Sequence, residues 1–187
     1  MISIVTPQIP AGQSAPALFL DRDDTLMVNH PYLGDPALVE LFPFACEGLK
    51  AFRAAGFRLI VVSNQSGLAR GFFTHEQLMA VTGRLVELLA QGGVALDAIY
   101  YCPHAPAENC ECRKPRTGLI EAACRDFKID LAKSLMVGDK AADIALAQNA
   151  HLAAAQFLPK DGEALLPDAS WHCRSLLELF GKYHITY

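Results

Sequence analysis

Two groups of aspartates stand out in the sequence, because each directly follows a short apolar run. Asp21, Asp23 and Asp24 fall within four consecutive positions, and Asp139 and Asp143 are spaced i and i+4, on one face of a helix. Converging like charges are unfavourable unless a cation neutralises them, and a small set of carboxylates suits Mg²⁺. A helix cap or a turn would explain a single aspartate, but two clusters at strand ends indicate a metal-dependent site.

A carboxylate beside a metal can attack phosphorus and form an acyl phosphate. The attack needs a metal and a lysine to offset charge on the phosphoryl oxygens. It also needs an acid that protonates the leaving oxygen and later acts as a base on water. Asp21, at the end of its strand, suits the nucleophile, and Asp23 suits the acid and base. The pattern predicts phosphoryl transfer through an aspartyl phosphate.

A different set of metal-binding residue types lies within residues 102–112. Three thiolates and one imidazole are a closed tetrahedral set for structural Zn²⁺, with no open position for catalysis. Free thiols or a disulfide are the alternatives. Zinc would fold this short loop and fix Arg113 and Lys114 immediately after it. The predicted zinc ligands are Cys102, His104, Cys110 and Cys112.

The elements that must position these residues alternate between apolar strands and amphipathic helices. We expect strands at 17–20, 57–62, 98–101, 134–137 and 152–155. We expect helices at 45–55, 74–89, 118–127, 141–149 and 173–180. Thr74 and Gln77 match a capping box at the start of the second helix.

Continuously apolar strands that alternate with helices predict a parallel sheet covered on both faces. This is a three-layer α/β/α Rossmann-like fold, in which ligands bind beyond the carboxyl ends of the strands. Asp21, Ser63, Cys102 and Asp139 each follow directly on an apolar strand. The sequence therefore predicts one site at one edge of the sheet.

Composition narrows the class of protein further. The chain has 187 residues, of which 52% are hydrophobic and 19% charged, which excludes wholesale disorder. The length predicts a single domain over 1–187, and the prolines and glycine in 1–16 predict a loose tail. We find no export signal and no apolar run as long as a membrane span. The net charge of −4, with scattered lysines and arginines, argues against a nucleic-acid surface. We expect a cytoplasmic monomer that binds neither nucleic acid nor membrane.

The motifs resemble those of the haloacid dehalogenase superfamily. Its phosphatases carry Asp-x-Asp-Gly-Thr after the first strand, a Ser or Thr after the second, a Lys, and Gly-Asp-x-x-x-Asp after the fourth. This chain has Asp21-Arg22-Asp23-Asp24-Thr25, Ser63-Asn64, Lys114 and Gly138-Asp139 with Asp143, in the same order between residues 17 and about 155. Too little sequence separates these motifs for a large cap domain. The resemblance implies a capless member with a short zinc-binding loop.

The resemblance also implies roles for individual residues. Asp21 is the nucleophile and a Mg²⁺ ligand. Asp23 is the acid and base and offers its backbone carbonyl to the metal. Ser63 and Lys114 hold the transferring phosphoryl group.

For the metal, the resemblance adds Asp139 as a ligand and places Lys140 in the same Mg²⁺ site, with Asp143 orienting Lys114 or a metal-bound water. One position departs from the family pattern, because Asp24 stands where the family has glycine. Aspartate tolerates left-handed backbone geometry better than most residues, but it adds negative charge beside the nucleophile. We expect a modest cost in rate or metal binding and an intact site.

Residues 63–71 and 100–104 further resemble small capless phosphatases that act on D-glycero-D-manno-heptose 1,7-bisphosphate. The related histidinol-phosphate phosphatases have a similar zinc loop and are the second candidate. A zinc-stabilised phosphosugar-binding module without catalysis is the third. The first resemblance implies a small phosphorylated sugar as substrate and release of its C7 phosphate in nucleotide-heptose synthesis for surface polysaccharide. The implied substrate contacts are Arg22, Asn29, His30, Pro31, Tyr32, Asn64, Gln65, Ser66 and Arg113.

Overall fold

Strands and helices alternate along most of the chain. The computed structural model describes residues 1–10 and 12–186. The strands are β1 (Ile2–Val5), β2 (Ala17–Leu20), β3 (Arg58–Asn64), β4 (Ala98–Cys102), β5 (Leu135–Gly138), β6 (Ala153–Phe157) and β7 (Trp171–Cys173). The helices are α1 (Ala45–Ala54), α2 (His75–Gln91), α3 (Gly118–Asp126), α4 (Ala141–Asn149) and α5 (Leu176–Thr186).

The seven strands of the described residues form one sheet in the order β1-β4-β3-β2-β5-β6-β7. Neighbouring strands run parallel, except that β1 pairs antiparallel with β4. In the register of the sheet, Leu18 of β2 lies opposite Leu59 of β3 and Leu135 of β5. β2 is therefore the central strand, and Asp21 follows its last residue.

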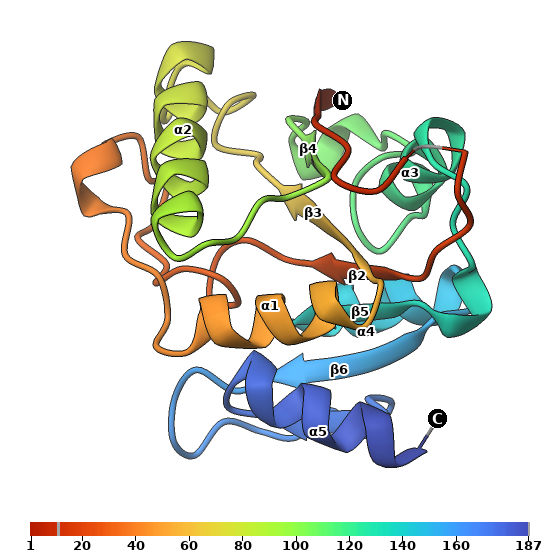
Figure 1. Cartoon of the computed structure of the whole chain (residues 1–187). Coiled ribbons are helices and arrows are strands. Elements are labelled where there is room, and N and C mark those ends of the chain that lie inside the picture. Colours follow the sequence, from red (N-terminus) through yellow and green to blue (C-terminus); the bar gives the residue numbers. More distant parts are fainter. Residues whose placement is uncertain (11, 187) are drawn as a thin grey trace.

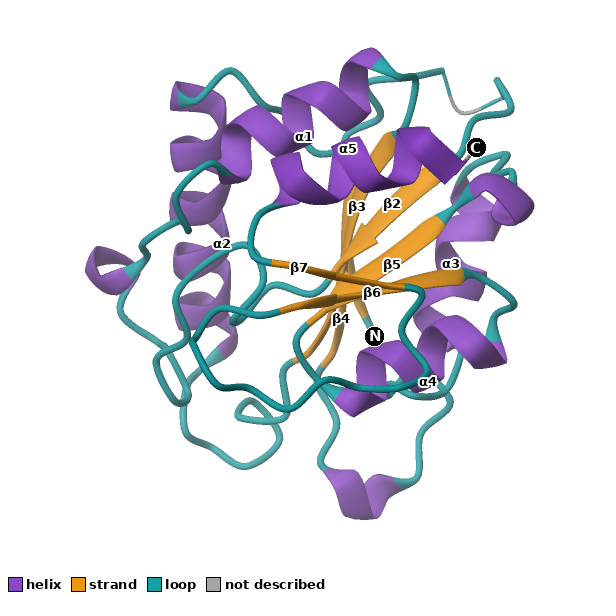
Figure 2. Cartoon of the chain, turned by 90° about the horizontal axis from the view of Figure 1, so that it is seen from below, coloured by secondary structure: helices purple, strands orange, loops and turns teal. Residues whose placement is uncertain are grey.

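Helices cover both faces of this sheet and give three layers (Figures 1 and 2). α1, α2 and α5 pack on one face, and α3 and α4 pack on the other. Side chains alternate along β2, so Leu18 and Leu20 join the first core while Ala17 and Phe19 join the second. All four are inaccessible to solvent, which explains why this strand is continuously apolar.

The structure confirms the predicted α/β/α fold and the predicted elements between residues 17 and 157, with ends shifted by one or two residues. The capping box of α2 is present, since the Gln77 N–H donates to Thr74 Oγ1 at 3.2 Å and the Thr74 N–H donates to Gln77 Oε1 at 2.8 Å. β3 is longer than predicted and ends at Asn64, which places Ser63 inside the strand. None of the described helices combines the length and the apolar character needed to cross a membrane.

The prediction of a loose tail over 1–16 is wrong for its first residues. Ile2–Val5 forms β1 and makes the sheet mixed. The next residues are anchored by two buried charged side chains. Asp97 Oδ1 accepts from the N–H groups of Gln8 and Ile9 at 2.8 and 3.2 Å, and Arg58 donates to the Ile9 carbonyl at 2.6 Å. These partners lie far away in sequence, so local composition does not indicate them.

The prediction of a last helix from residue 173 is also wrong at its start. Cys173 ends β7, an edge strand paired with β6, and α5 begins at Leu176. β7 has only three residues, which is too short for a periodic pattern to separate it from the adjoining helix.

Candidate active site and metal centres

The carboxyl ends of β2, β3 and β5 meet at one edge of the sheet, and the predicted catalytic residues lie there. Asp21 follows β2, and its N–H donates to the Val137 carbonyl of β5 at 2.9 Å. Ser63 is near the end of β3, and Asp139 follows β5. Because β2 lies between β3 and β5, the sheet brings these three residues together.

Lys114 reaches this edge from the loop that follows the cysteine cluster. Its ammonium group lies 2.9 Å from Asp21 Oδ1 and 2.6 Å from Asp143 Oδ1, and it donates to the Val62 carbonyl at 2.9 Å. Asn64 holds the backbone of Lys114, because Asn64 Oδ1 accepts the Lys114 N–H at 3.0 Å and Asn64 Nδ2 donates to the Lys114 carbonyl at 3.2 Å. The sequence left two partners for Asp143, Lys114 or a metal-bound water, and the structure shows that Asp143 contacts Lys114.

These surroundings shift pKa values in different directions. Burial raises the pKa of Asp21, but the charge and hydrogen bond of Lys114, together with hydrogen bonds from Ser63 and the Arg22 backbone, outweigh burial and hold that pKa below its ordinary value. Burial lowers the pKa of Lys114, but Asp143 and Asp21 outweigh it and raise that pKa above its ordinary value. Burial raises the pKa of Asp143, although Lys114 opposes the shift. Burial raises the pKa of Asp139 to about 7, with Lys140 opposing and the nearby aspartates adding to the shift.

The carboxylates at this edge fit a hard divalent cation. One oxygen from each of Asp21, Asp139 and Asp143 lies within 4.8 Å of the others. Asp139 Oδ1 is buried and makes no hydrogen bond, an arrangement that a bound cation would satisfy. Asp143 is already engaged, since it contacts Lys114 and accepts the Lys140 N–H at 3.1 Å. Asp21 and Asp139 are therefore the carboxylates best placed to hold Mg²⁺.

Lys140 is also predicted for the Mg²⁺ site, but its side chain carries an ammonium group in place of a carboxylate. Its ammonium group lies 3.4 Å from Asp139 Oδ2, and its carbonyl accepts the Asp143 N–H at 2.9 Å. An ammonium group has no lone pair for a metal, so Lys140 could contact Mg²⁺ only through its carbonyl. That role stays a prediction, while the Lys140 side chain lines the substrate cavities described below.

Asp23 is held by two neighbouring side chains. Arg22 Nε and Nη2 donate to Asp23 Oδ1 and Oδ2, each at 3.0 Å. Gln65 Nε2 donates to Asp23 Oδ2 at 2.8 Å and to Ser63 Oγ at 3.1 Å. Arg22 Nη2 also donates to Gln65 Oε1 at 3.0 Å. The predicted acid and base therefore has a fixed orientation at the edge of the sheet.

Two adjoining cavities lie over these groups. The larger has a volume of about 410 Å³ and is lined by Asp21, Ser63, Lys114 and Arg113 among others. The smaller, of about 260 Å³, extends from Asp23 toward the loop before α1. The structure brings every predicted substrate contact to one or both: Arg22, Asn29, His30, Pro31, Tyr32, Asn64, Gln65, Ser66 and Arg113.

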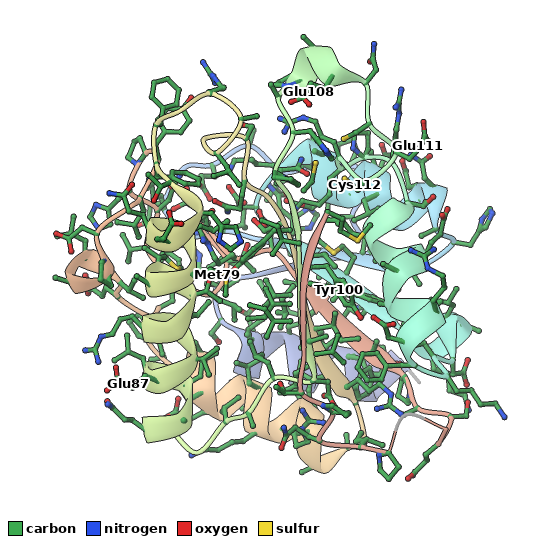
Figure 3. All side chains as sticks on the ribbon, turned by 90° about the horizontal axis from the view of Figure 1, so that it is seen from above. Met79, Glu87, Tyr100, Glu108, Glu111 and Cys112 are labelled. Atoms are coloured by element: carbon green, nitrogen blue, oxygen red, sulfur yellow. The ribbon has the colours of Figure 1, made fainter. Side chains whose placement is uncertain are left out.

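The four predicted zinc ligands also converge, in the loop that follows β4 (Figure 3, where Glu108, Glu111 and Cys112 mark this loop). Cys110 Sγ lies 3.5 Å from Cys102 Sγ and 3.6 Å from Cys112 Sγ, and His104 Nδ1 lies 3.6 Å from Cys102 Sγ and 3.3 Å from Cys112 Sγ. In a tetrahedral site with Zn–S of about 2.3 Å, sulfur atoms are about 3.8 Å apart. The cysteines are not disulfide-bonded, so the disulfide alternative is wrong and the donor set fits a zinc ion.

Known proteins are similar to this chain in sequence and in fold. A HAD-hydrolase-like family model matches residues 111–158. Over 178 residues the chain is 39% identical to D-glycero-beta-D-manno-heptose-1,7-bisphosphate 7-phosphatase of Yersinia pestis, covering 89% of this chain and 94% of that protein. The Escherichia coli K12 enzyme of the same name is 38% identical over 179 residues, covering 90% and 93%. The chain belongs to this family of HAD-like phosphatases.

A solved structure of the heptose bisphosphate phosphatase family has the same fold. The D,D-heptose 1,7-bisphosphate phosphatase from B. bronchiseptica, complexed with magnesium and phosphate, aligns with a TM-score of 0.82 and 28% identity. The alignment covers 92% of this chain and 99% of that one. A relative with this fold therefore binds magnesium and phosphate.

Asp24, which stands where the family has glycine, has a left-handed backbone conformation, as expected at a glycine position. Asp24 has a φ of 55°, in the left-handed region. Its Oδ2 accepts a hydrogen bond from Asn29 Nδ2 at 3.0 Å. The aspartate thus holds a residue that lines the smaller cavity, a contact that glycine could not make.

Sequence patterns indicated no role for Arg70 and Phe72, which lie at the rim of the site. The rings of Tyr32 and Phe72 are 4.1 Å apart, and the Arg70 guanidinium lies over both, at 5.4 and 5.0 Å. Arg70 also donates to the Tyr32 hydroxyl at 2.7 Å. This cluster joins the loop before α1 to the loop before α2. Both Arg70 and Phe72 are exposed, so no periodic signal could have identified them.

Proposed function

We propose that this chain removes the 7-phosphate of D-glycero-D-manno-heptose 1,7-bisphosphate in a Mg²⁺-dependent reaction through an aspartyl phosphate. The family membership supports the substrate, since the named relatives are 7-phosphatases of this sugar. The observation that carries the chemistry is the ion pair between Lys114 and Asp21, buried at the floor of a cavity large enough for a sugar phosphate.

In the first half of the reaction, an Asp21 oxygen attacks phosphorus. The bond between phosphorus and the C7 oxygen breaks as the Asp23 carboxyl gives its proton to that oxygen. Ser63 and Lys114 hold the phosphoryl oxygens. Asp21 and Asp139 would hold Mg²⁺, which would supply positive charge to offset the negative charge of the phosphoryl group.

In the second half, the Asp23 carboxylate takes a proton from a water molecule. The water oxygen bonds to phosphorus, the bond between phosphorus and the Asp21 oxygen breaks, and inorganic phosphate leaves. Lys114 remains paired with Asp143 through both halves, so the phosphoryl group has a fixed cationic neighbour.

Arg113 favours a bisphosphate over histidinol phosphate. The larger cavity is lined by three cations and three carboxylates, so its charges balance in number. Among the cations, Arg113 has a planar guanidinium group that can hold a second phosphate by two hydrogen bonds. Histidinol phosphate carries an ammonium group and an imidazole at its other end, which offer this guanidinium no anion to bind.

We further propose that the cysteine cluster binds a structural Zn²⁺. The spacing of its donor atoms supports a closed site, and the loop leads directly into Arg113 and Lys114. A closed site leaves no position for a substrate. Zinc would therefore act on catalysis only by fixing these two residues.

The proposal also includes a cytoplasmic monomer without nucleic-acid or membrane partners. The net charge of −4 supports the absence of a nucleic-acid partner, because nucleic acid is itself negatively charged. Light scattering of the purified protein at several concentrations measures the mass, and a mass above one chain would contradict the monomer.

The test compares steady-state kcat/KM for both heptose bisphosphate anomers, fructose bisphosphate and histidinol phosphate with Mg²⁺. We expect a heptose bisphosphate to be the best substrate. Asp21→Asn is expected to abolish turnover of all of them, and mass spectrometry of acid-quenched wild type should find a phosphoryl group on the peptide that contains Asp21. Higher kcat/KM for histidinol phosphate would support the second candidate. Unchanged turnover in Asp21→Asn would contradict the reaction itself.

A further inference from the structure

We propose that Arg22 and Gln65 are positioning residues for Asp23, which act through that side chain on proton transfer to the leaving oxygen. This inference rests on the proposed function, in which Asp23 is the acid and base. It gives Arg22 and Gln65 a role other than the substrate contact that family resemblance implies.

The three side chains form a closed ring of hydrogen bonds. Each of Arg22, Asp23 and Gln65 bonds to both of the others, at 2.8 to 3.0 Å. Arg22 is 1% exposed and Gln65 is 4% exposed, and the Arg22 guanidinium also lies 5.6 Å from the centre of the Tyr101 ring. Buried polar groups that are bonded to one another in this way are held in a single arrangement.

The ring holds both oxygens of Asp23. Oδ2 accepts from Gln65 Nε2 at 2.8 Å and Oδ1 accepts from Arg22 Nε at 3.0 Å, while Arg22 Nη2 lies 3.0 Å from Oδ2 and 2.9 Å from Oδ1. The Asp23 side chain is 18% exposed and lines both cavities, so the ring fixes the orientation in which this carboxyl group faces the substrate.

Gln65 has little capacity left for a substrate. Its two amide N–H groups donate to Asp23 and Ser63, and its carbonyl accepts from Arg22. Arg22 retains one buried nitrogen, Nη1, without a hydrogen-bond partner. Replacing Gln65 therefore tests the positioning of Asp23 separately from direct binding of the substrate.

General acid catalysis matters only when the leaving oxygen needs a proton. A sugar alkoxide needs one, whereas p-nitrophenolate leaves without it. The kinetic constant kcat/KM covers the steps up to the departure of the leaving group, so it reports on proton donation by Asp23. Gln65→Met keeps the size of the side chain and removes its hydrogen bonds.

We expect Gln65→Met to lower kcat/KM for heptose bisphosphate by about 10- to 100-fold, the effect of losing a hydrogen bond to a charged group. The same variant should keep nearly wild-type kcat/KM for p-nitrophenyl phosphate. Gln91→Met, an exposed glutamine on α2, is the matched control and should change neither substrate. Equal loss on both substrates would overturn the proposal.

A double-mutant cycle supplies the second readout. Asp23→Asn should lower kcat/KM for heptose bisphosphate by about 10²- to 10⁴-fold and spare p-nitrophenyl phosphate. If Gln65 acts through Asp23, adding Gln65→Met to Asp23→Asn should cost nothing more. A further loss in the double variant would place the action of Gln65 on Ser63 or on the substrate and overturn the inference. Failure of Asp23→Asn to discriminate between the two substrates would instead contradict the proposed role of Asp23.

Arg22 is tested by Arg22→Lys, which keeps the charge and loses the two-pronged contact to Asp23. We expect the same selective loss on heptose bisphosphate as for Gln65→Met. The proposal is contradicted if folded Arg22→Lys keeps wild-type kcat/KM for that substrate. Because Arg22 is buried, circular dichroism of this variant is measured first, and the Gln65 cycle decides the question if the variant does not fold.

Discussion

Replacing Asp139 by asparagine is expected to stabilise the Mg²⁺-free protein at alkaline pH. The Asp139 side chain is 12% exposed and its Oδ1 makes no hydrogen bond. Burial, with the nearby aspartates, raises its pKa from 3.8 to about 7. The folded state therefore keeps a proton that the unfolded chain has released. Asparagine resembles the protonated carboxyl in shape and never has to ionise.

The sign and the size of the effect follow from linkage. Since the folded pKa of Asp139 is raised, its ionisation costs stability progressively as pH rises from 3.8 to about 7, and the full cost remains above that range. A shift of about three pKa units corresponds to about 4 kcal/mol. Between pH 5 and pH 8 the advantage of asparagine should grow by about 3 kcal/mol.

The assay is urea unfolding of both proteins at pH 5 and pH 8, followed by the fluorescence of the single tryptophan. Mg²⁺ is removed by dialysis without a chelator, because a chelator would also take zinc. Added Mg²⁺ at a hundred times its Kd should stabilise the wild type by about 2.7 kcal/mol and Asp139→Asn far less. A stability difference that is the same at both pH values would refute the reasoning. Equal stabilisation of both proteins by Mg²⁺ would remove Asp139 from the metal site.

Two further substitutions test the zinc loop and the support of Lys114. Cys112→Ser should lose bound zinc and have a lower kcat. Cys124→Ser, at an exposed cysteine outside the cluster, is the control and should keep its zinc and its kcat. Metal analysis measures the zinc and phosphate release measures kcat, and full zinc content in Cys112→Ser would contradict the site. In Gly138→Ala the added methyl group would overlap the Asp143 side chain, so we expect kcat to fall and unfolding to need about 1 to 3 kcal/mol less. Gly83→Ala is the control, because Gly83 on α2 has open space around it, and it should instead stabilise the folded protein by about 0.5 to 1 kcal/mol. A Gly138→Ala variant as stable and as active as wild type would contradict the close packing around Gly138.

Most of the fold could be predicted because buried parallel strands and amphipathic helices leave different periodic patterns. The apolar run of β2 and the capping box of α2 are local signals, and both elements form where they indicate. β1 escaped prediction because its stability depends on pairing with β4 and on the anchors Asp97 and Arg58. None of those contacts is local, so no window of sequence around Ile2–Val5 contains them.

The sequence by itself determined which chemical groups the site contains, because in a parallel sheet the residues that follow successive strands arrive at one edge. Asp21 and Asp139 are of this kind, and Ser63 is the last residue but one of β3. Only the tertiary structure decided how those groups pair. Lys114 lies between two carboxylates, and Gln65 bonds to Arg22 across 43 positions of sequence. Spacing along the chain carries no information on such contacts, since they arise from the order of the strands and the path of the loops between them.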